Sequence, residues 1–169
     1  MNNIVEEKKR SPIYLYTDGA SSGNPGPGGY GVVLKCDSHR REISRGYSLT
    51  TNNRMELLAV IVGLEAITWK NAEVHVYSDS SYVVNAIKQG WLENWKRKGF
   101  KKVKNVDLWL RFDKVYSRHR VSLNWIKGHA GHPENERCDE LAVAAGAGQV
   151  ALGVELPPDP GYVPEEGLL

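Results

Sequence analysis

The sequence predicts an α/β fold built on a mixed five-stranded sheet, in which three antiparallel strands are followed by alternating strands and helices. Two patterns carry this prediction. Three strand-like segments come first, and the Gly-rich or polar links between them are too short for a crossover connection. Helical spacing begins near Met55, and strand and helix patterns then alternate. At 169 residues the chain is long enough to bury one hydrophobic core.

The first half provides the antiparallel strands. Alternation over residues 13–17 predicts the first strand, and residues 26–29 form a Gly-rich turn before a second strand at 30–35. Residues 41–49 are expected to form the third strand. These short connections favour a meander at one side of the sheet.

The second half alternates helices with strands. Apolar residues at helical spacing follow Asn52 and Asn53, which provide a capping signal and place Glu56 in the first turn. An aromatic and basic segment at 91–103 interrupts the alternation. The remaining elements are expected as a strand at 73–78, a helix at 80–89, a helix at 107–117, a strand at 121–126 and a helix at 134–147.

Composition places the chain among globular proteins of ordinary type. Charged residues make up 25% and hydrophobic residues 41%, which excludes a disordered or fibrous protein. We expect an N-terminal extension at 1–11, one folded domain at 12–147 with a basic protrusion at about 91–104, and a flexible tail at 148–169. The tail is assigned because its Gly, Pro and acidic residues show no periodicity.

Several features bear on location and partners. Two cysteines, a charged N-terminus and the absence of an apolar run of about 18 residues predict a protein of the reducing cytoplasm with no membrane span. A monomer is the default expectation. The net charge is only +2, but the segment 88–104 holds seven basic residues and one acid, so positive charge is concentrated locally.

Four acidic residues are the candidate catalytic groups. Asp18, Glu56, Asp79 and Asp139 each lie at the end or in the first turns of a predicted element. Carboxylates that converge need a cation, and oxygen ligands suit Mg²⁺, which predicts metal-dependent phosphoryl transfer. Each acid also has a structural alternative: Asp18 in an Asp-Gly hairpin turn, Glu56 in a capping box with Asn53, Asp79 as a helix cap and Asp139 as a solvated helix acid.

The local contexts of these acids together resemble one family. The matching stretches are YTDGASSGNPGPGGYG (16–31), TNNRMEL (51–57), YSDSSYV (77–83), the region of NWKRKG and KNVDL (94–108), and WIKGHAGHPENERCDELA (125–142). In this order they are similar to the type 1 ribonucleases H, over about residues 13–145. The fold that the resemblance implies is the ribonuclease H-like one, with helices flanking the sheet.

The resemblance also implies an activity. It predicts endonucleolytic hydrolysis of the RNA strand of an RNA/DNA hybrid, giving 5′-phosphate and 3′-hydroxyl ends, with two Mg²⁺ ions that Mn²⁺ can replace. By that resemblance Asp18, Glu56, Asp79 and Asp139 bind metal, with Asp18 between the two ions. His129 matches the family's mobile catalytic histidine.

Substrate contacts follow from the same likeness. In the family the basic protrusion grips the DNA strand, and residues near Asn24, Asn52 and Asn53 contact the hybrid. Ser81 stands where bacterial members often have Gln, and the piece between Gly99 and Val103 is shorter than in bacterial relatives. The candidate substrate-binding residues are Asn24, Thr51, Asn52, Asn53, Trp91, Trp95, Lys96, Arg97, Lys98, Lys101 and Lys102.

Three alternatives stay open at this point. The protein could be a hybrid-binding module without activity, or another metal-dependent nuclease of the same broad fold. A structural zinc site formed by His129, His132, Cys138 and Cys36 is also considered, although no Cys-x-x-Cys pair supports it.

Overall fold

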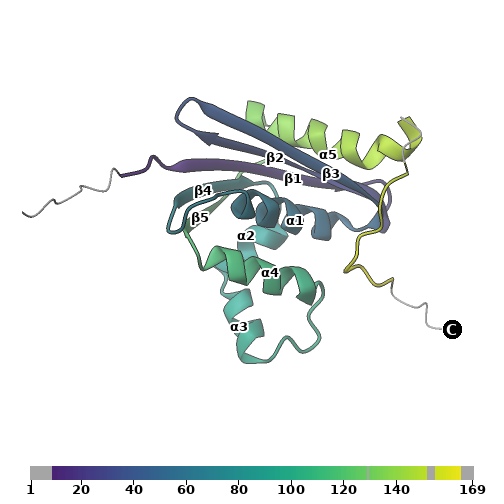
Figure 1. Ribbon diagram of the computed structural model, residues 1–169. Helices are drawn as coiled ribbons and strands as arrows, with labels where there is room; N and C mark the ends of the chain where they lie inside the picture. Colours follow the sequence, from purple (N-terminus) through teal and green to yellow (C-terminus); the bar gives the residue numbers. More distant parts are fainter. Residues whose placement is uncertain (1–8, 129, 152–154, 165–169) are drawn as a thin grey trace, which may run out of the picture.

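The computed structural model describes residues 9–128, 130–151 and 155–164. It contains one sheet with helices on both faces (Figure 1). The long helix near the C-terminus lies on one face, and the other helices lie on the opposite face. None of the described helices is long and apolar enough to cross a membrane.

The sheet is mixed, as the sequence predicts. Its strands are β1 (Ile13–Ser21), β2 (Gly26–Cys36), β3 (His39–Thr50), β4 (Glu73–Ser78) and β5 (Arg120–Trp125). The spatial order is β3-β2-β1-β4-β5, with antiparallel pairing of β1, β2 and β3 and parallel pairing of β1, β4 and β5. The carboxyl ends of β1 and β4 therefore lie side by side, which is where ligands bind in open α/β sheets.

The helices fill the two outer layers. Helix α5 covers β1, β2 and β3, whereas α1 packs between the opposite face and α4. The helices are α1 (Asn52–Glu65), α2 (Ser81–Lys88), α3 (Trp91–Arg97), α4 (Val106–Tyr116) and α5 (Pro133–Ala151).

Helix α1 is buried more completely than its sequence spacing indicates. The spacing predicts one apolar side, but every residue from Arg54 to Leu64 except Val62 is buried. The second buried side exists because α4 packs against it with Trp109 and Phe112, which are both fully enclosed. The central helix thus joins the sheet to the outer helical layer.

One local prediction about the first strands is wrong. Residues 26–29 were expected to form a turn, yet they belong to β2 and pair with β1 and β3. The reversal lies earlier, where the backbone N–H of Ser22 donates to the carbonyl oxygen of Pro27 at 2.7 Å. Gly29 serves packing, because a Cβ there would lie 2.7 Å from the carbonyl oxygen of Ala142 in α5, whereas Gly26 belongs to the reversal, because a Cβ there would lie 1.9 Å from the carbonyl oxygen of Ser22.

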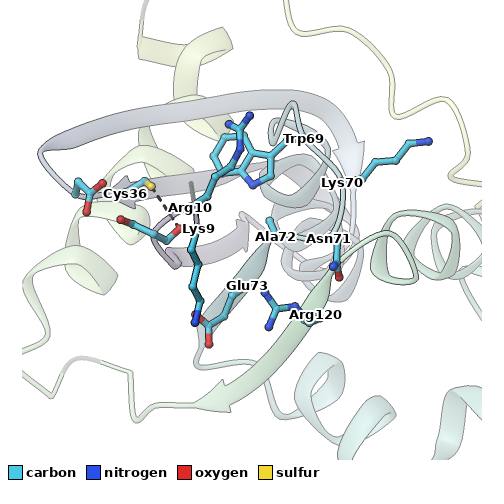
Figure 2. Close-up of a pocket in the computed structure, with 11 residues that line it drawn as sticks. Lys9, Arg10, Cys36, Trp69, Lys70, Asn71, Ala72, Glu73 and Arg120 are labelled. Atoms are coloured by element: carbon cyan, nitrogen blue, oxygen red, sulfur yellow. Dashed lines mark hydrogen bonds between the residues drawn. The ribbon is translucent and has the colours of Figure 1, made fainter. Parts of the chain in front are cut away.

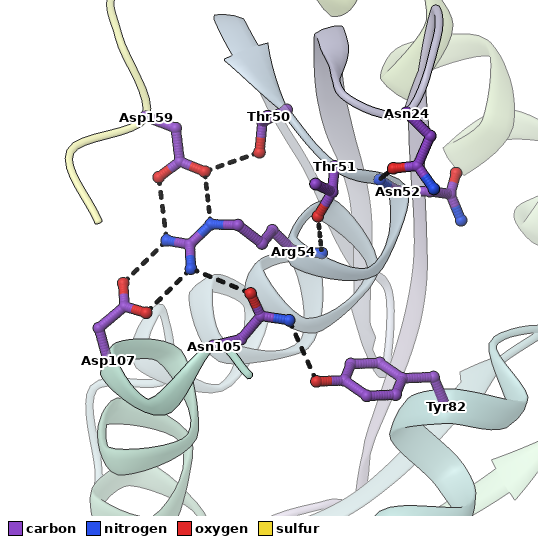
Figure 3. A network of polar contacts seen from close by, with 9 residues as sticks. All are labelled: Asn24, Thr50, Thr51, Asn52, Arg54, Tyr82, Asn105, Asp107 and Asp159. Atoms are coloured by element: carbon purple, nitrogen blue, oxygen red, sulfur yellow. Dashed lines mark hydrogen bonds and ion pairs between the residues drawn. The ribbon is translucent and has the colours of Figure 1, made fainter. Parts of the chain in front are cut away.

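The C-terminal segment is fixed to the domain by a buried ion pair. The Arg54 side chain is 2% exposed, and its Nε lies 2.7 Å from Oδ2 of Asp159, whose side chain is 3% exposed (Figure 3). The same guanidinium binds Asp107 through two hydrogen bonds, and Thr50 Oγ1 donates to Asp159 at 2.6 Å. The residue pattern of the segment gave no indication of this anchor.

The two ends of the parallel strands face different surroundings. The carboxyl ends of β1 and β4 carry Asp18 and Asp79. Near the opposite end, a cavity of about 980 Å³ is lined by residues that precede β1 and β4 and by the first residue of β5 (Figure 2).

Candidate metal centre

Asp18 is held by the central strand of the sheet. It lies within β1, pairs with Gly31 of β2 and is 5% exposed. The backbone N–H of Gly19 donates to its Oδ1 at 2.9 Å. Because β1 continues to Ser21, the Asp-Gly dipeptide forms no hairpin turn, and that alternative is wrong.

Glu56 reaches the same place from helix α1. The N-cap of this helix is Thr51, whose side chain accepts from the N–H of Arg54, so Glu56 does not belong to a capping box with Asn53. A Cβ at Gly19 would lie 2.3 Å from the backbone nitrogen of Glu56. Only glycine therefore permits this close approach of β1 to α1, and the approach brings Glu56 next to Asp18.

Asp79 follows the last residue of β4. The cap of α2 is Ser80, whose hydroxyl accepts from the N–H of Val83 at 3.3 Å, so Asp79 is not the helix cap. The indole N–H of Trp125 donates to the backbone carbonyl oxygen of Asp79 at 3.1 Å. A Cβ at Gly128 would lie 2.6 Å from Oδ2 of Asp79, so the chain after β5 passes directly beside the carboxylate.

Asp139 comes from the other face of the sheet, on helix α5. This helix can lie close to β2 because Gly31 has no side chain. A Cβ there would lie 2.2 Å from the carbonyl oxygen of Cys138. After burial and the charge of Asp79, the side chain of Asp139 is a smaller cause of the raised pKa of Asp18. The Asp139 side chain is half-buried. Its neighbour Arg137 forms an ion pair with Glu140 rather than with Asp139.

Three of the four predicted acids form one cluster. One carboxylate oxygen each from Asp18, Glu56 and Asp79 lies within 4.8 Å of the others. Burial, and then the charge of Asp79, raise the pKa of Asp18 from 3.8 to about 8. Burial, followed by the charges of Asp18 and Asp79, also raises the pKa of Glu56 well above its ordinary value. Such carboxylates resist being charged together.

The donor set fits a hard divalent cation. All three side chains offer oxygen ligands, which Mg²⁺ and Ca²⁺ prefer. Oε2 of Glu56 is buried and has no hydrogen-bond partner among the residues described. A cation between the carboxylates would remove their repulsion and coordinate this oxygen. The cluster can therefore hold a metal ion.

The candidate substrate residues lie in two groups. Asn24 and the first turn of α1 form one group, in which Oδ1 of Asn24 accepts from the N–H of Asn52 at 3.2 Å. Thr51 is the helix cap, correcting the expectation that Asn52 and Asn53 cap the helix. Asn24, Thr51 and Asn53 line a cavity of about 640 Å³ together with residues 161–164.

The second group is the basic protrusion. It consists of α3 and the loop to Asn105, with Trp91 41% exposed and Trp95 packed edge-on against Trp109. Lys96 forms ion pairs with Glu93 and Asp113. Within the described ranges no ion pair involves the side chains of Lys98, Lys101, Lys102 or Arg97.

Two further predictions concern His129 and zinc. His129 lies outside the described residues, so its role stays a prediction. Cys36 is at the end of β2, and Cys138 is buried in α5. Over residues 9–128, 130–151 and 155–164, neither cysteine belongs to a group of three potential metal ligands.

Comparison with known proteins decides the family. The RNase H family model matches residues 10–147. The chain belongs to the RNase H family. A ribonuclease H of Desulforamulus reducens is 59% identical over 148 residues, covering 85% of this chain and 92% of the relative. One from Cronobacter sakazakii is 52% identical, covering 92% and 97%. As a family member the chain is a nuclease, and hence a hydrolase.

Solved RNase H structures share the fold. LC9-RNase H1, described as a type 1 RNase H with the type 2 active-site motif, superposes with a TM-score of 0.77 at 32% identity, covering 85% of this chain and 75% of that one. LC11-RNase H1, solved in complex with RNA/DNA hybrid, has a TM-score of 0.60 at 29% identity, covering 82% and 99%. The sheet order and helical layers expected of an RNase H fold are therefore confirmed.

Sequence reasoning missed the residues that position the RNase H cluster. Trp125 and Gly128 were noticed only as part of a matching motif, and their contacts with Asp79 were not expected. The glycines at 19 and 31 were assigned to turns or strands rather than to helix contacts. A glycine inside a strand pattern is the available signal, because it marks close backbone approach.

The position of Gly128 leads to a prediction. In Gly128→Ala, the new methyl group would lie 2.6 Å from Oδ2 of Asp79 and displace that carboxylate from the cluster. We expect kcat to fall about tenfold or more, because small misplacements of catalytic groups are costly, while the melting temperature changes little. Steady-state kinetics and thermal melts measure both.

Gly148→Ala is the matched control, since a Cβ there would be 3.6 Å from Leu156, an ordinary contact. Equal activity of the two variants would show that Gly128 does not position Asp79.

Proposed function

We propose that this protein hydrolyses the RNA strand of RNA/DNA hybrids, leaving 5′-phosphate and 3′-hydroxyl ends, with two divalent ions bound by Asp18, Glu56, Asp79 and Asp139. The observation that carries the proposal is the convergence of three buried or half-buried carboxylates within 4.8 Å in a chain of the RNase H family. A binding module without activity would have no need of such a mutually repelling cluster.

The resident ions that we propose are Mg²⁺, with Mn²⁺ as a possible substitute. When bound, such ions make water nucleophilic near neutral pH and stabilise charge on the leaving oxygen. Asp18, Glu56, Asp79 and Asp139 would hold these ions, with Asp18 presented by the central strand. Trp125 and Gly128 keep Asp79 in place through its backbone and its carboxylate.

His129 is assigned to proton transfer at the departing oxygen or to product release. Imidazole titrates near neutral pH and therefore suits either task. Its sequence neighbours Gly128, Ala130 and Gly131 are small.

The hybrid would be held at both groups of candidate residues. Phe100 and Val103 pack against the core, and this anchors the loop that presents Lys101 and Lys102 to solvent. Cations on such a loop can neutralise phosphates of the DNA strand, and Trp91 adds an exposed ring. Asn24, Thr51, Asn52 and Asn53 would contact the hybrid near the RNA 2′-hydroxyls, which distinguish RNA from DNA. Exposed Ser81 provides a shorter side chain than Gln at that place.

The protrusion lysines provide a direct test of substrate binding. For Lys101→Ala/Lys102→Ala we expect a higher KM and a slope of log K against log salt that is smaller by about 0.9 for each lost phosphate contact. Saturated kcat should stay within about twofold, since neither lysine reaches the acids. Lys114→Ala, on the exposed side of α4, is the control. An unchanged salt slope would mean that the two lysines contact no phosphate.

Metal binding should depend on pH in a defined direction. The raised pKa of Asp18 means that the metal-free folded protein retains a proton that the unfolded chain loses, so stability falls as the pH rises from about 4 to about 8. Mg²⁺ replaces this proton. The increase in melting temperature at a fixed Mg²⁺ concentration should therefore grow up to about pH 8 and then level off. A pH-independent increase would place the ion elsewhere.

The activity itself is tested with three labelled duplexes. RNA/DNA hybrid, double-stranded RNA and double-stranded DNA are incubated with Mg²⁺ and, separately, with EDTA. We expect cleavage of the RNA strand of the hybrid only, and none in EDTA or with Asp79→Asn. Cleavage of duplex DNA instead would favour a different nuclease of the same fold. We further propose a cytoplasmic monomer, which size-exclusion chromatography tests for its oligomeric state.

A further inference from the structure

The cavity of about 980 Å³ lies away from the acidic cluster, at the end where the parallel strands begin. Lys9, Arg10 and Ser11 precede β1, residues 69–72 join α1 to β4, and Arg120 begins β5. Asp79 follows the other end of β4, six residues along the strand, which is roughly 20 Å at about 3.3 Å per residue. A ligand here would not enter the catalytic centre.

The charge of this cavity is positive and is not neutralised internally. Four cationic side chains, Lys9, Arg10, Lys70 and Arg120, line it beside two acids, Asp37 and Glu73. Across the described parts of the chain, none of the four cations forms an ion pair. By contrast, Arg40, Arg54, Arg111 and Arg137 are all ion-paired. The cavity cations remain available to an anion.

The cavity also has a flat wall. The guanidinium of Arg10 lies over the ring of Trp69, 4.5 Å from its centroid, and Figure 2 shows the two side chains against each other. Arg10 is exposed, so a second planar group can stack on it from outside. Backbone hydrogen bonds hold the opposite wall together. The N–H of Asn71 donates to the carbonyl oxygen of Arg118 at 2.8 Å, and the N–H of Arg120 donates to that of Ala72 at 2.9 Å.

We propose that this cavity binds single-stranded nucleic acid at a second site, separate from the site of hydrolysis. Unpaired cations next to an aromatic and arginine surface are the combination that holds single strands, through phosphates and stacked bases. The bases of a duplex are stacked on one another and cannot reach a wall inside a concavity. The cavity is comparable in volume with those that hold drug-sized ligands, so it takes only a few nucleotides. The site would hold single-stranded flanks of a nucleic-acid substrate.

The test measures binding of a fluorescein-labelled oligo-dT by anisotropy in EDTA, where no cleavage is involved. The background is Lys101→Ala/Lys102→Ala, which limits binding at the protrusion. Adding Lys70→Glu/Arg120→Glu should weaken binding about tenfold and reduce the salt slope by about 0.7 for each lost contact. The control for the same change of charge is Arg45→Glu/Lys114→Glu, on β3 and α4.

Photocrosslinking with a 5-iodouracil oligonucleotide locates the site independently. Crosslinks should map to Arg10, Trp69 or their immediate neighbours. Crosslinks confined to residues 91–105, or equal weakening by the cavity and control variants, would overturn the proposal. Neither anisotropy nor crosslinking needs a metal ion. A negative result in these binding measurements is therefore distinguishable from a failure of the proposed hydrolysis.

Discussion

Asp18→Asn should abolish hydrolysis while hybrid binding is largely retained. The substitution keeps the shape of the side chain but removes one of the three negative charges that would together hold a cation. Losing about 4 kcal/mol of transition-state stabilisation corresponds to about a thousandfold lower kcat. Binding persists because the protrusion cations are unaltered. Single-turnover cleavage and anisotropy with labelled hybrid measure the two effects.

The same variant should gain stability when no metal is present. Asp18 is buried next to two other carboxyls, so near neutral pH the metal-free folded protein must keep on it a proton that the unfolded chain gives up, and a neutral amide avoids that cost. We expect a higher melting temperature than that of the unsubstituted protein in EDTA, and a smaller increase on adding Mg²⁺. Glu140→Gln, an exposed acid one residue after Asp139, is the control and should alter neither property. Cleavage by Asp18→Asn at near-normal rates would exclude Asp18 from the mechanism.

Arg54→Met should be the most destabilising of the substitutions considered. It leaves Asp159 buried without its cation, and removal of one partner of a buried ion pair costs about 3 to 5 kcal/mol. At about 2 to 4 °C per kcal/mol for a chain of this size, the melting temperature should fall by about 10 °C. Thermal and urea unfolding both report the loss.

An exposed ion pair offers a matched comparison. Arg111 pairs with Glu65 at the surface, and both side chains are more than one third exposed. Arg111→Met should therefore cost about 1 kcal/mol or less. If Arg54→Met proved no more harmful than Arg111→Met, the C-terminal anchor would contribute little to stability.

Much of this architecture is predictable because local patterns determine it. Alternation and helical spacing give the five strands and every helix except α3 in their correct order, and the position of Asp79 after a strand places it at a ligand-binding edge. The role of residues 26–29 is not local. Gly29 is required by contact with α5, about 110 residues later, and no nearby pattern distinguishes that need from a turn.

The candidate site also combines residues that the sequence indicates with residues that it does not. Asp18, Glu56 and Asp79 are predictable because the motifs that contain them together resemble the type 1 ribonucleases H. Trp125 acts through its indole N–H on a backbone oxygen of Asp79, and Asp159 acts on a guanidinium more than one hundred residues away. Such pairings depend on tertiary contacts, so the periodicity of either segment cannot reveal them.

The separation of Asp159 from Arg54 by 105 residues affects how a newly made chain matures. Synthesis proceeds from the N-terminus, and a domain generally folds as a unit. Arg54, Asp107 and all the acids of the metal centre emerge from the ribosome before Asp159 does. One partner of the guanidinium is thus made after every acid of the candidate site, and the network closes only once Asp159 has emerged.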